Sequence, residues 1–195
     1  MLITPEELAS YLQEDLDTAT ATLVIEIATG VVQAATSQRL VQVVDDPFTI
    51  YLDEYDTSRW LELPELPVTA ASGFMVGATA VTDVTLDASR GRLYRPCGWR
   101  SSTVYPPSSP STVTGIYTHG YATGDRRLQL ARSVVLVLAA ACYGNPSAAT
   151  REQIDDYAVQ YTETATARLD ETPATVAALR RAYGRGPRSA LLLKG

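Results

Sequence analysis

The spacing of apolar residues changes twice along this chain, from the period of a helix to that of short strands and back again. The segment Thr4–Glu7 combines a capping threonine, a proline in the first turn and a capping-box glutamate, which predicts a short helix to about Leu12. A second helix is predicted from about Asp17 to Ser37. Its apolar face consists of Leu16, Leu23, Ile27, Val31 and Ala34. Gly30 costs roughly 1 kcal/mol inside a helix, which favours close packing of another helix there.

From Leu40 onward the chain has the composition of short antiparallel strands. The segments VQVV, FTIYL, RWLEL, VTAA, FMV and RLYRP are rich in Val, Ile, Tyr and Thr, and are separated by Pro47, Pro64, Pro67, Gly73, Gly77 and Gly91. Asp87–Gly91 predicts a tight turn between two of these strands. Ser101–Thr112, rich in serine and proline, predicts a long loop, which in a small domain is often functional. Val113–His119 is the last predicted strand of this region.

The helical period returns after Ala122, where Asp125 is a good cap for a third helix. Val134–Cys142 is an unbroken apolar run with no polar face, which predicts burial on all sides of this helix. Ile154–Thr162 predicts one more short strand. A last helix starts at Thr172-Pro173 and ends at Gly184. Its buried stripe is Val176, Leu179 and Tyr183.

These elements predict an α+β fold, in which a small α-helical bundle surrounds a buried central helix and carries an inserted antiparallel β region and an extended C-terminal tail. The predicted boundaries are 1–39 for the first part of the helical core, 40–119 for the β-rich insertion with its loop at 101–112, 120–183 for the second part of the core, and 184–195 for the tail. With 195 residues the chain is predicted to form one elaborated domain. The absence of an apolar run of 18 residues predicts no membrane span, and the N-terminus does not have the pattern of a secretory signal.

Charge is distributed unevenly along the sequence. Residues 1–87 hold fifteen acids and two arginines, a net charge of −13, whereas residues 88–195 hold seven acids and fourteen bases, a net charge of +7. Such a chain favours either self-association of unlike faces or pairing of the two halves within one monomer. An overall charge of −6 argues against general DNA binding.

Three residues are candidates for contacts between subunits. Arg126 and Arg127 lie in the first turn of a predicted helix, where the helix dipole disfavours cations, so they call for acidic partners in the same chain or in a neighbour. The chain has eleven tyrosines and two phenylalanines, and tyrosine is enriched at interfaces. Tyr105, in its proline-rich loop, is the tyrosine most suited to an interface. The alternative for the tyrosines as a group is ordinary half-buried positions in strands.

No motif predicts catalysis, a metal site or a cofactor. His119 is the only histidine, and its place at a strand end favours a structural role over a catalytic one. The acidic clusters lack the spacing of a calcium loop, and no phosphate-binding glycine loop is present. Cys97 is predicted to be a loop thiol and Cys142 a small buried side chain, with no disulfide framework.

Three segments resemble the head-tail connectors, or adaptors, of tailed bacteriophages, as found in phages of actinobacteria. They are ITPEELASYLQEDLDTATATLVIEIATGVVQAATSQRL, LPELPVTAASGFMVGATAVTDVTLDASRGRLYRPCGW and THGYATGDRRLQLARSVVLVLAAACYGNP. Together they cover most of the chain up to Pro146. The motifs describe a scaffold and not a reactive site.

The resemblance implies a non-enzymatic virion protein of the neck, made in the bacterial cytoplasm. It implies a homo-oligomeric ring, commonly of twelve subunits, that binds the portal protein above and a stopper or tail-completion protein below, while genomic DNA passes through the channel without sequence-specific binding. In this family the C-terminal tail commonly reaches toward the portal. The corresponding residues here are Arg180, Arg181, Tyr183, Arg185, Arg188, Leu191, Leu192 and Leu193.

Two other functions remain open at the level of sequence. One is a different neck protein, such as a stopper or tail-completion protein, although these are usually small β barrels and the apolar run Val134–Cys142 argues against one. The other, more distant, is an enzyme that uses His119.

Overall fold

The computed structural model describes residues 1–52, 58–99, 112–144, 151–154, 157–160 and 173–184. The chain divides into two compact units. The helical unit comprises Met1–Gln38 and Thr123–Gly195, and the β unit comprises Arg39–Ala122. The mixture of helices and antiparallel sheets confirms the predicted α+β class.

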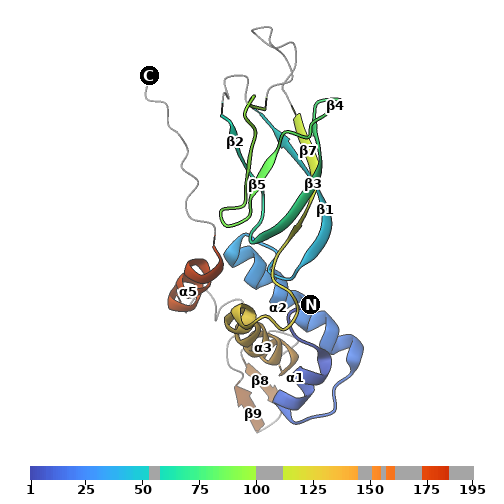
Figure 1. The fold of residues 1–195 in the computed structure, drawn as a ribbon. Helices are drawn as coiled ribbons and strands as arrows, with labels where there is room; N and C mark the ends of the chain where they lie inside the picture. The colour runs from blue at the N-terminus through green and yellow to red at the C-terminus, as the bar shows by residue number, and fades with distance from the viewer. Residues whose placement is uncertain (53–57, 100–111, 145–150, 155–156, 161–172, 185–195) are drawn as a thin grey trace. The chain divides into compact units, whose positions relative to one another are not determined.

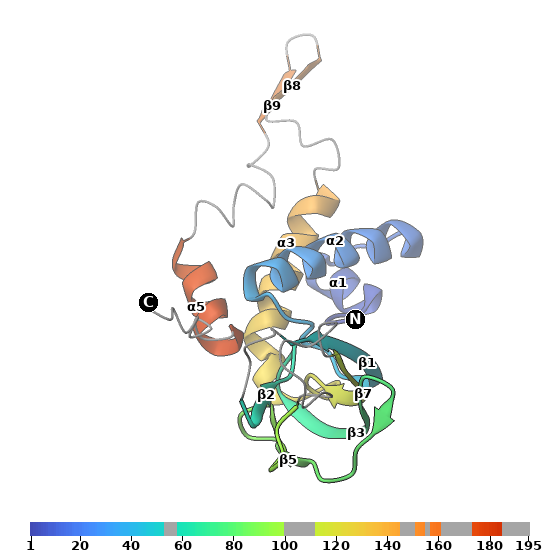
Figure 2. The same cartoon turned by 90° about the horizontal axis from the view of Figure 1, so that it is seen from above.

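The helical unit has four α-helices in its described residues. They are α1 (Pro5–Leu12), α2 (Thr18–Thr36), α3 (Gln129–Gly144) and α5 (Pro173–Tyr183), and α3 is preceded by the short 3-10 helix η1 (Arg126–Leu128). The predicted starts of the first two are confirmed, because Thr4 and Glu7 form a complete capping box and Asp17 accepts a hydrogen bond of 2.8 Å from the backbone N–H of Thr20. Figure 2 shows α2 lying across α3, with α1 beside them.

The apolar face predicted for α2 is not the face that it buries. The buried residues are Ala21, Val24, Ile25, Ala28, Val32 and Thr36. Leu23 and Ile27, two residues of the predicted apolar face, are 57% and 49% exposed. The helix is apolar on two sides, and it packs in the helical unit with the side that carries Ala21, Ile25 and Ala28. The prediction that Gly30 receives another helix is also wrong within this chain, since a Cβ built at Gly30 would have no atom within 4 Å.

The expected burial of α3 on all sides is also wrong. Its buried side chains are Ala131, Val135, Leu138 and Ala139, all on one face, whereas Val137 is 45% exposed. The neighbouring helices α1 and α2 cover only part of its circumference. The apolar run therefore supplies one face to the core of the chain and leaves another face open.

One short strand was predicted at Ile154–Thr162, and the structure has two in this region. The strands β8 (Arg151–Ile154) and β9 (Tyr157–Gln160) pair antiparallel, with Arg151 opposite Gln160. Asp155 and Asp156, which lie between them in sequence, were read as the middle of a strand and fall outside the described residues.

The β unit contains two small antiparallel sheets. The first has the strand order β1-β7-β3-β4, from β1 (Val43–Tyr51), β3 (Val68–Val76), β4 (Thr79–Ala80) and β7 (Thr112–His119). The second has the order β2-β6-β5, from β2 (Trp60–Glu62), β5 (Thr85–Asp87) and β6 (Arg92–Tyr94). Figure 1 shows β7 between β1 and β3. The predicted turn at Asp87–Gly91 is confirmed, since it joins the paired strands β5 and β6.

Two predicted strand breaks lie inside strands. Pro47 is part of β1, which pairs with β7 alone and so can accommodate a residue without an N–H donor. Gly73 is part of β3, where a register shift between Ser72 and Met75 marks a bulge and the glycine has a φ of +64°. Each residue therefore bends a continuous strand instead of ending it.

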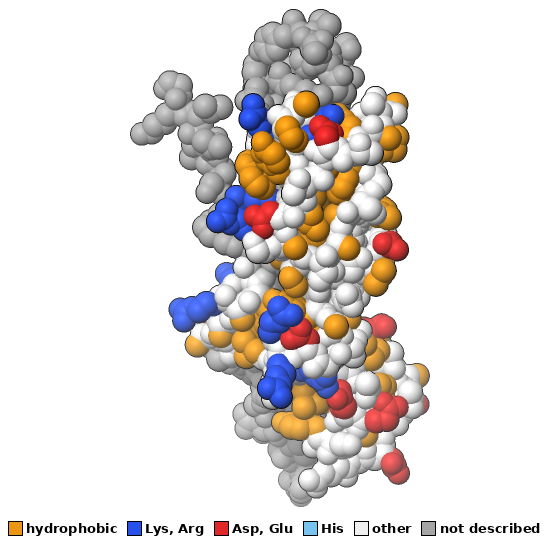
Figure 3. Space-filling model, in the orientation of Figure 1, with side chains coloured by type: hydrophobic (Ala, Val, Ile, Leu, Met, Phe, Trp, Pro, Cys, Tyr) orange, Lys and Arg blue, Asp and Glu red, His pale blue; other side chains and the backbone are white. Residues whose placement is uncertain are grey.

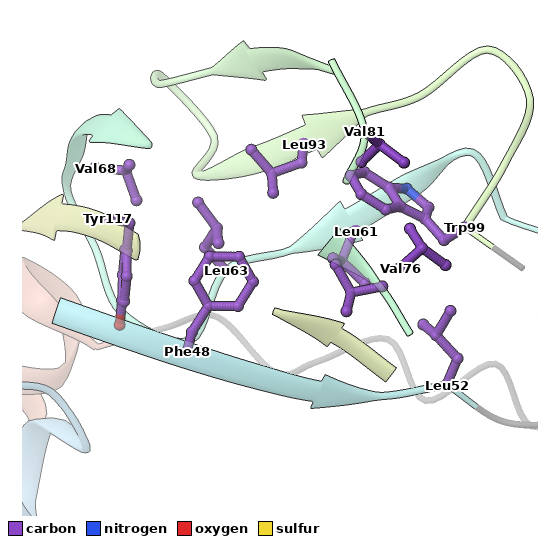
Figure 4. Close-up of a cluster of buried hydrophobic side chains, with 11 residues drawn as sticks. Phe48, Leu52, Leu61, Leu63, Val68, Val76, Val81, Leu93, Trp99 and Tyr117 are labelled. Atoms are coloured by element: carbon purple, nitrogen blue, oxygen red, sulfur yellow. The ribbon is translucent and has the colours of Figure 1, made fainter. Parts of the chain in front are cut away.

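Side chains from both sheets form one hydrophobic core. Figure 4 shows the Phe48 ring beside Tyr117 and Leu63, and Trp99 near Val76 and Val81 at the other end of the cluster. The Phe48 and Tyr117 rings meet edge to face, with centroids 5.5 Å apart. This core holds β7 in place, and β7 carries His119 at its end.

Candidate functional site

His119 is the buried member of a polar cluster of the β unit, in which Arg39, Asp46 and Glu65 are half-buried. The imidazole has no exposed surface and stacks on Tyr117, with ring centroids 4.6 Å apart. Its Nε2 atom lies 3.2 Å from both Arg39 Nη2 and Asp46 Oδ2. Its Nδ1 atom lies 3.5 Å from Glu65 Oε2, too far for a normal hydrogen bond. Strand β1 supplies Asp46 and β7 supplies His119, so the cluster joins two neighbouring strands.

Arg39 is the cation that balances this cluster. Its guanidinium pairs with Asp46 and donates a hydrogen bond of 2.7 Å from Nε to Glu65 Oε1, and its backbone N–H donates to Glu65 Oε2 at 2.8 Å. The hydrogen bond from Arg39 holds the pKa of Asp46 below its usual range. Burial, together with the charges of Glu65 and Asp46, raises the pKa of Tyr117 to about 12.

The geometry around His119 does not supply the parts of a hydrolytic site. Its polar contacts in the described structure are two carboxylates and a guanidinium, with no hydroxyl or thiol nucleophile. A side chain with no exposed surface also cannot meet a substrate. Within the described residues, no group of three or more His, Cys, Asp or Glu side chains is arranged to hold a metal ion. Cys97 and Cys142 are free thiols, the first exposed and the second half-buried.

Arg126 and Arg127, the candidates from the helix start, have different surroundings. Arg127 pairs with Asp125, with 2.7 Å between Nη2 and Oδ2, and Asp125 also caps the turn by accepting from the Arg127 backbone N–H. The acidic partner that the sequence predicts for Arg127 is thus Asp125, two residues away in the same chain. Arg126 is exposed and has no acidic partner among the described residues of the helical unit. Arg132, one turn further, pairs with Glu7 of α1 across the side of a shallow hollow that Ser10 and Leu136 also line.

The end of α5 is fastened to the helical unit by hydrogen bonds. The Tyr183 hydroxyl donates to the carbonyl of Arg127 and accepts from the N–H of Ala131, and its side chain is buried. The Gln38 side-chain amide donates to the Tyr183 carbonyl at 2.6 Å. The predicted buried residue Leu179 is confirmed as buried and the predicted end of the helix is confirmed at Gly184.

Of the residues predicted to meet the portal, Arg180 and Arg181 are exposed on α5, and Arg180 Nε donates to the carbonyl of Ala35 at 3.2 Å. Tyr183 is buried at the base of the tail and contacts its own chain. Five further candidates of the tail, and the inter-subunit candidate Tyr105, lie outside the described residues. They are Arg185, Arg188, Leu191, Leu192 and Leu193.

Exposed apolar side chains on α2 and α3 are the surface feature that sequence reasoning missed. Leu23 and Ile27 project from α2, and Leu130 and Val137, 38% and 45% exposed, project from α3. Figure 3 shows apolar side chains open on the surface of the helical unit, with acidic side chains grouped over α1 and its connection to α2. The signal was present in the sequence, since the apolar residues of α2 fit two helix faces and not one.

By length and composition alone, α2 and the helix Arg126–Gly144 could each cross a membrane, although no uninterrupted apolar run of 18 residues exists. Core helices of soluble proteins pass the same test, so the observation is weak evidence for a span. In this chain the two helices pack on each other, and the second carries Arg132 paired with Glu7. An ion pair on the side of the helix is costly in a bilayer, so we assign the two helices to the core of the helical unit.

The fold, a helical unit interrupted by an antiparallel β unit, also occurs in solved structures. A chain in the neck of an empty gene transfer agent (GTA) particle, computed with C6 symmetry, has a TM-score of 0.58 at 16% identity, over 95% of this chain and 91% of that chain. A chain in the virion of a native GTA particle has a TM-score of 0.57 at 17% identity, over 95% and 90%. A third, in the neck of a native GTA particle computed with C12 symmetry, has a TM-score of 0.52 at 18% identity, over 91% and 88%. No protein-family model and no curated protein matches the chain by sequence.

Proposed function

We propose that this protein is a head-to-tail adaptor, a structural and non-enzymatic subunit of the neck of a virion or virion-like particle. The observation that carries the proposal is the shared fold with chains of GTA necks and virions, which extends over at least 88% of both partners in each comparison. The similarity of three sequence segments to phage adaptors supports it independently. The burial of His119 agrees with a role that needs no catalytic base.

In this role the chain forms a ring of twelve copies, docked under the portal protein and joined below to a stopper or tail-completion protein. Genomic DNA passes through the ring without sequence-specific contacts. The C12 symmetry of one neck that contains a similar chain supports the stoichiometry. A ring built from identical copies needs two different faces that complement each other.

The portal contact is assigned to the C-terminal tail and the helix before it. Arg180 and Arg181 are exposed on α5, and the basic, leucine-bearing segment that contains Arg185 and Leu191–Leu193 follows directly. Tyr183 has a different role, because its side chain is buried and its hydroxyl is hydrogen-bonded to the backbone at the start of α3. It anchors the base of the tail, and the residues on either side of it meet the portal.

The experiment compares three forms of the chain for binding to the portal protein encoded with it. They are the full chain, a chain that ends at Gly184, and a full-length variant in which Leu191, Leu192 and Leu193 are replaced by serine. We expect the chain ending at Gly184 to stay folded, because α5 is already bonded to α2 and α3, and to lose portal binding. The serine variant separates the contribution of the leucines from that of tail length.

Locating the protein in a density map of the particle tests the wider proposal. A ring between portal and tail is expected. Wild-type portal binding by the chain that ends at Gly184 would remove the tail from the contact, and a position in the tail tube or capsid would overturn the adaptor assignment. Particle assembly should proceed normally with His119→Ala if the variant folds, and a specific loss of activity in folded His119→Ala would instead favour an enzyme.

A further inference from the structure

The outer face of α2 carries an apolar stripe that nothing in the described chain covers. The stripe consists of Leu23, Ile27, Gly30 and Ala34, which follow one another at intervals of four, three and four residues and so lie on one side of the helix. All four are exposed. A Cβ built at Gly30 would meet no atom within 4 Å, so the middle of the stripe is open to the close approach of another backbone. We call this the α2 stripe.

The outer face of α3 carries a second stripe with the same spacing. It consists of Leu130, Val134, Val137 and Ala141, of which the first and third are exposed and the others half-buried. At a rise of about 1.5 Å per residue each stripe is about 16 Å long. We call this the α3 stripe. Each stripe begins with branched side chains and ends in small ones, since Leu23 and Ile27 precede Gly30 and Ala34 on α2, and Ala141 ends the α3 stripe. Branched side chains of one stripe can therefore fit the space over the small residues of the other.

The two stripes face away from each other. The helices α2 and α3 pack together, and each buries the face opposite its stripe: Ala21, Ile25 and Ala28 of α2 are buried, as are Val135 and Ala139 of α3. A second copy seated on the α2 stripe therefore leaves the α3 stripe of the first copy free for a third. This is the geometry of a head-to-tail contact, which continues from copy to copy and forms a ring where the rotation between copies closes.

The distribution of charge favours a contact between α2 of one copy and α3 of another over a contact between two α2 helices or two α3 helices. Residues 1–38, which contain α2, hold six acids and no base, whereas residues 123–144, which contain α3, hold three arginines and one aspartate. Glu14 and Glu26 of the first segment and Arg126 of the second are exposed without an opposite charge among the described residues. Glu26 is the one charged residue of α2 itself, and Arg126 lies just before α3. Pairing α2 with α2 would therefore bring two acidic segments together, whereas pairing α2 with α3 brings an acidic segment to one that carries Arg126.

From these observations we propose that the α2 stripe of one copy packs on the α3 stripe of the next, and that this contact is the repeating interface of the ring. The inference rests on the proposed function, which supplies the ring, and it adds the two helix faces that form the contact between subunits. The occupant of each stripe is a second copy of this chain. The presence of Gly30 in α2 predicts close packing of another helix. In this proposal the small residues of the α2 stripe allow that close approach between subunits and not within one subunit.

The test measures the mass of complexes formed by the full chain, by native mass spectrometry or light scattering over a range of concentrations. Ile27→Glu places a charge in the α2 stripe and Val137→Glu places one in the α3 stripe. Because both positions are exposed in the single chain, both variants should fold. The matched controls Gln33→Glu and Ser133→Glu add the same charge to the same helices outside the stripes. Each stripe variant should weaken self-association at least about tenfold, since it buries an unpaired charge, whereas the controls should not.

A mixture of the two stripe variants gives the sharpest result. Ile27→Glu retains an intact α3 stripe and Val137→Glu an intact α2 stripe, so the mixture should form one-to-one complexes that grow no further. Dimers of either variant alone would indicate a contact between like helices and overturn the proposal. Wild-type chain that stays monomeric at every concentration would also overturn it, because the stripes would then not be self-complementary.

Two results separate this inference from the proposed function. If the wild-type chain forms rings and both stripe variants form the same rings, the stripes are not the interface while the adaptor role stands. If the wild-type chain floats with phosphatidylcholine vesicles and the stripe variants do not, the stripes bind lipid and the proposal fails. The position of the protein in a density map of the particle, determined separately, decides the adaptor role in either case.

Discussion

The half-buried ion cluster of Arg39, Asp46 and Glu65 shows how a single buried polar residue, His119, is kept in the core of the β unit. His119 has no exposed surface, yet it lies within 3.2 Å of Asp46 and of the Arg39 guanidinium, which itself pairs with Glu65. A buried charge is stabilised only when an opposite charge and hydrogen bonds accompany it. The cluster meets that condition, and it ties the end of β7 to the start of β1 and to the segment before β3.

The charge of Asp46 should make part of the stability depend on pH. Its pKa in the folded protein is lowered, chiefly by the hydrogen bond from Arg39, below the value of about 3.9 typical of an unfolded chain. The stabilisation is therefore complete above about pH 4 and is lost as the pH falls through the folded pKa. We expect the difference in free energy of unfolding between wild type and Asp46→Asn to shrink below pH 4, as measured by urea titration. The exposed neighbour Asp45→Asn provides the control, and a difference that does not change with pH would contradict the role of Asp46.

Gly120 is a position where the backbone itself excludes a side chain. It has a φ of +84°, and a Cβ there would lie 2.7 Å from the carbonyl oxygen of Val41. Gly124 has a similar φ of +87° but open space around it. We expect Gly124→Ala to cost about 1–2 kcal/mol from conformation alone. Gly120→Ala should cost distinctly more, because the clash adds to the strain, and urea unfolding of both variants measures the difference. Equal losses would show that the backbone at Val41 moves aside.

At the scale of elements, local sequence signals predict where the helices begin and end, but not which face of a helix is buried. The capping box of Thr4 and Glu7 and the cap at Asp17 were predicted correctly, because each acts within one turn. The buried face of α2 was predicted wrongly, because the helix has two apolar sides and only the packing of α3 selects between them. Pro47 and Gly73 were read as strand breaks for a similar reason, since only the sheet shows that an edge strand and a bulge accommodate them.

The attachment of α5 can be tested through one hydroxyl group. Tyr183 Oη bonds to the carbonyl of Arg127 and the N–H of Ala131, and both backbone groups lose a partner in Tyr183→Phe. We expect a loss of about 1–3 kcal/mol in the free energy of unfolding, together with faster amide hydrogen exchange in α5. Tyr143→Phe is the control, because its hydroxyl makes one long contact of 3.4 Å at an exposed position. It should change stability by less than about 0.5 kcal/mol. Unchanged exchange in Tyr183→Phe would show that packing alone holds α5.

At the scale of the whole molecule, the division of charge does not follow the division into units. The net charge of −13 in residues 1–87 and +7 in residues 88–195 becomes −3 in each compact unit, because the helical unit combines the two ends of the sequence. Several charges pair inside the chain, as Arg132 does with Glu7 and Arg95 with Asp83. Intramolecular pairing, one of the two alternatives left by the sequence, thus accounts for part of the pattern.

Arg126 and Glu26 are exposed and have no charged partner in the part of the chain that the structure describes, so they are available to a neighbouring copy. If they contribute to the ring contact, association of the full chain should weaken as ionic strength rises from about 0.05 M to about 0.5 M, where the Debye length shortens from more than 10 Å to less than 5 Å. The dissociation constant measured by sedimentation at several salt concentrations checks this. Association that is insensitive to salt would assign the contact to the apolar stripes alone.

Residues close together in the chain were enough to predict the order of helical and β-rich segments, the starts of α1 and α2, the end of α5 and the α+β class, because caps, turns and apolar periods act over short distances in sequence. The tertiary structure decided the rest. It placed His119 among Arg39, Asp46 and Glu65, and left the apolar runs of α2 and α3 half covered. These outcomes depend on contacts between segments far apart in sequence. An apolar period indicates which residues share a helix face, but not whether that face is buried or which element covers it.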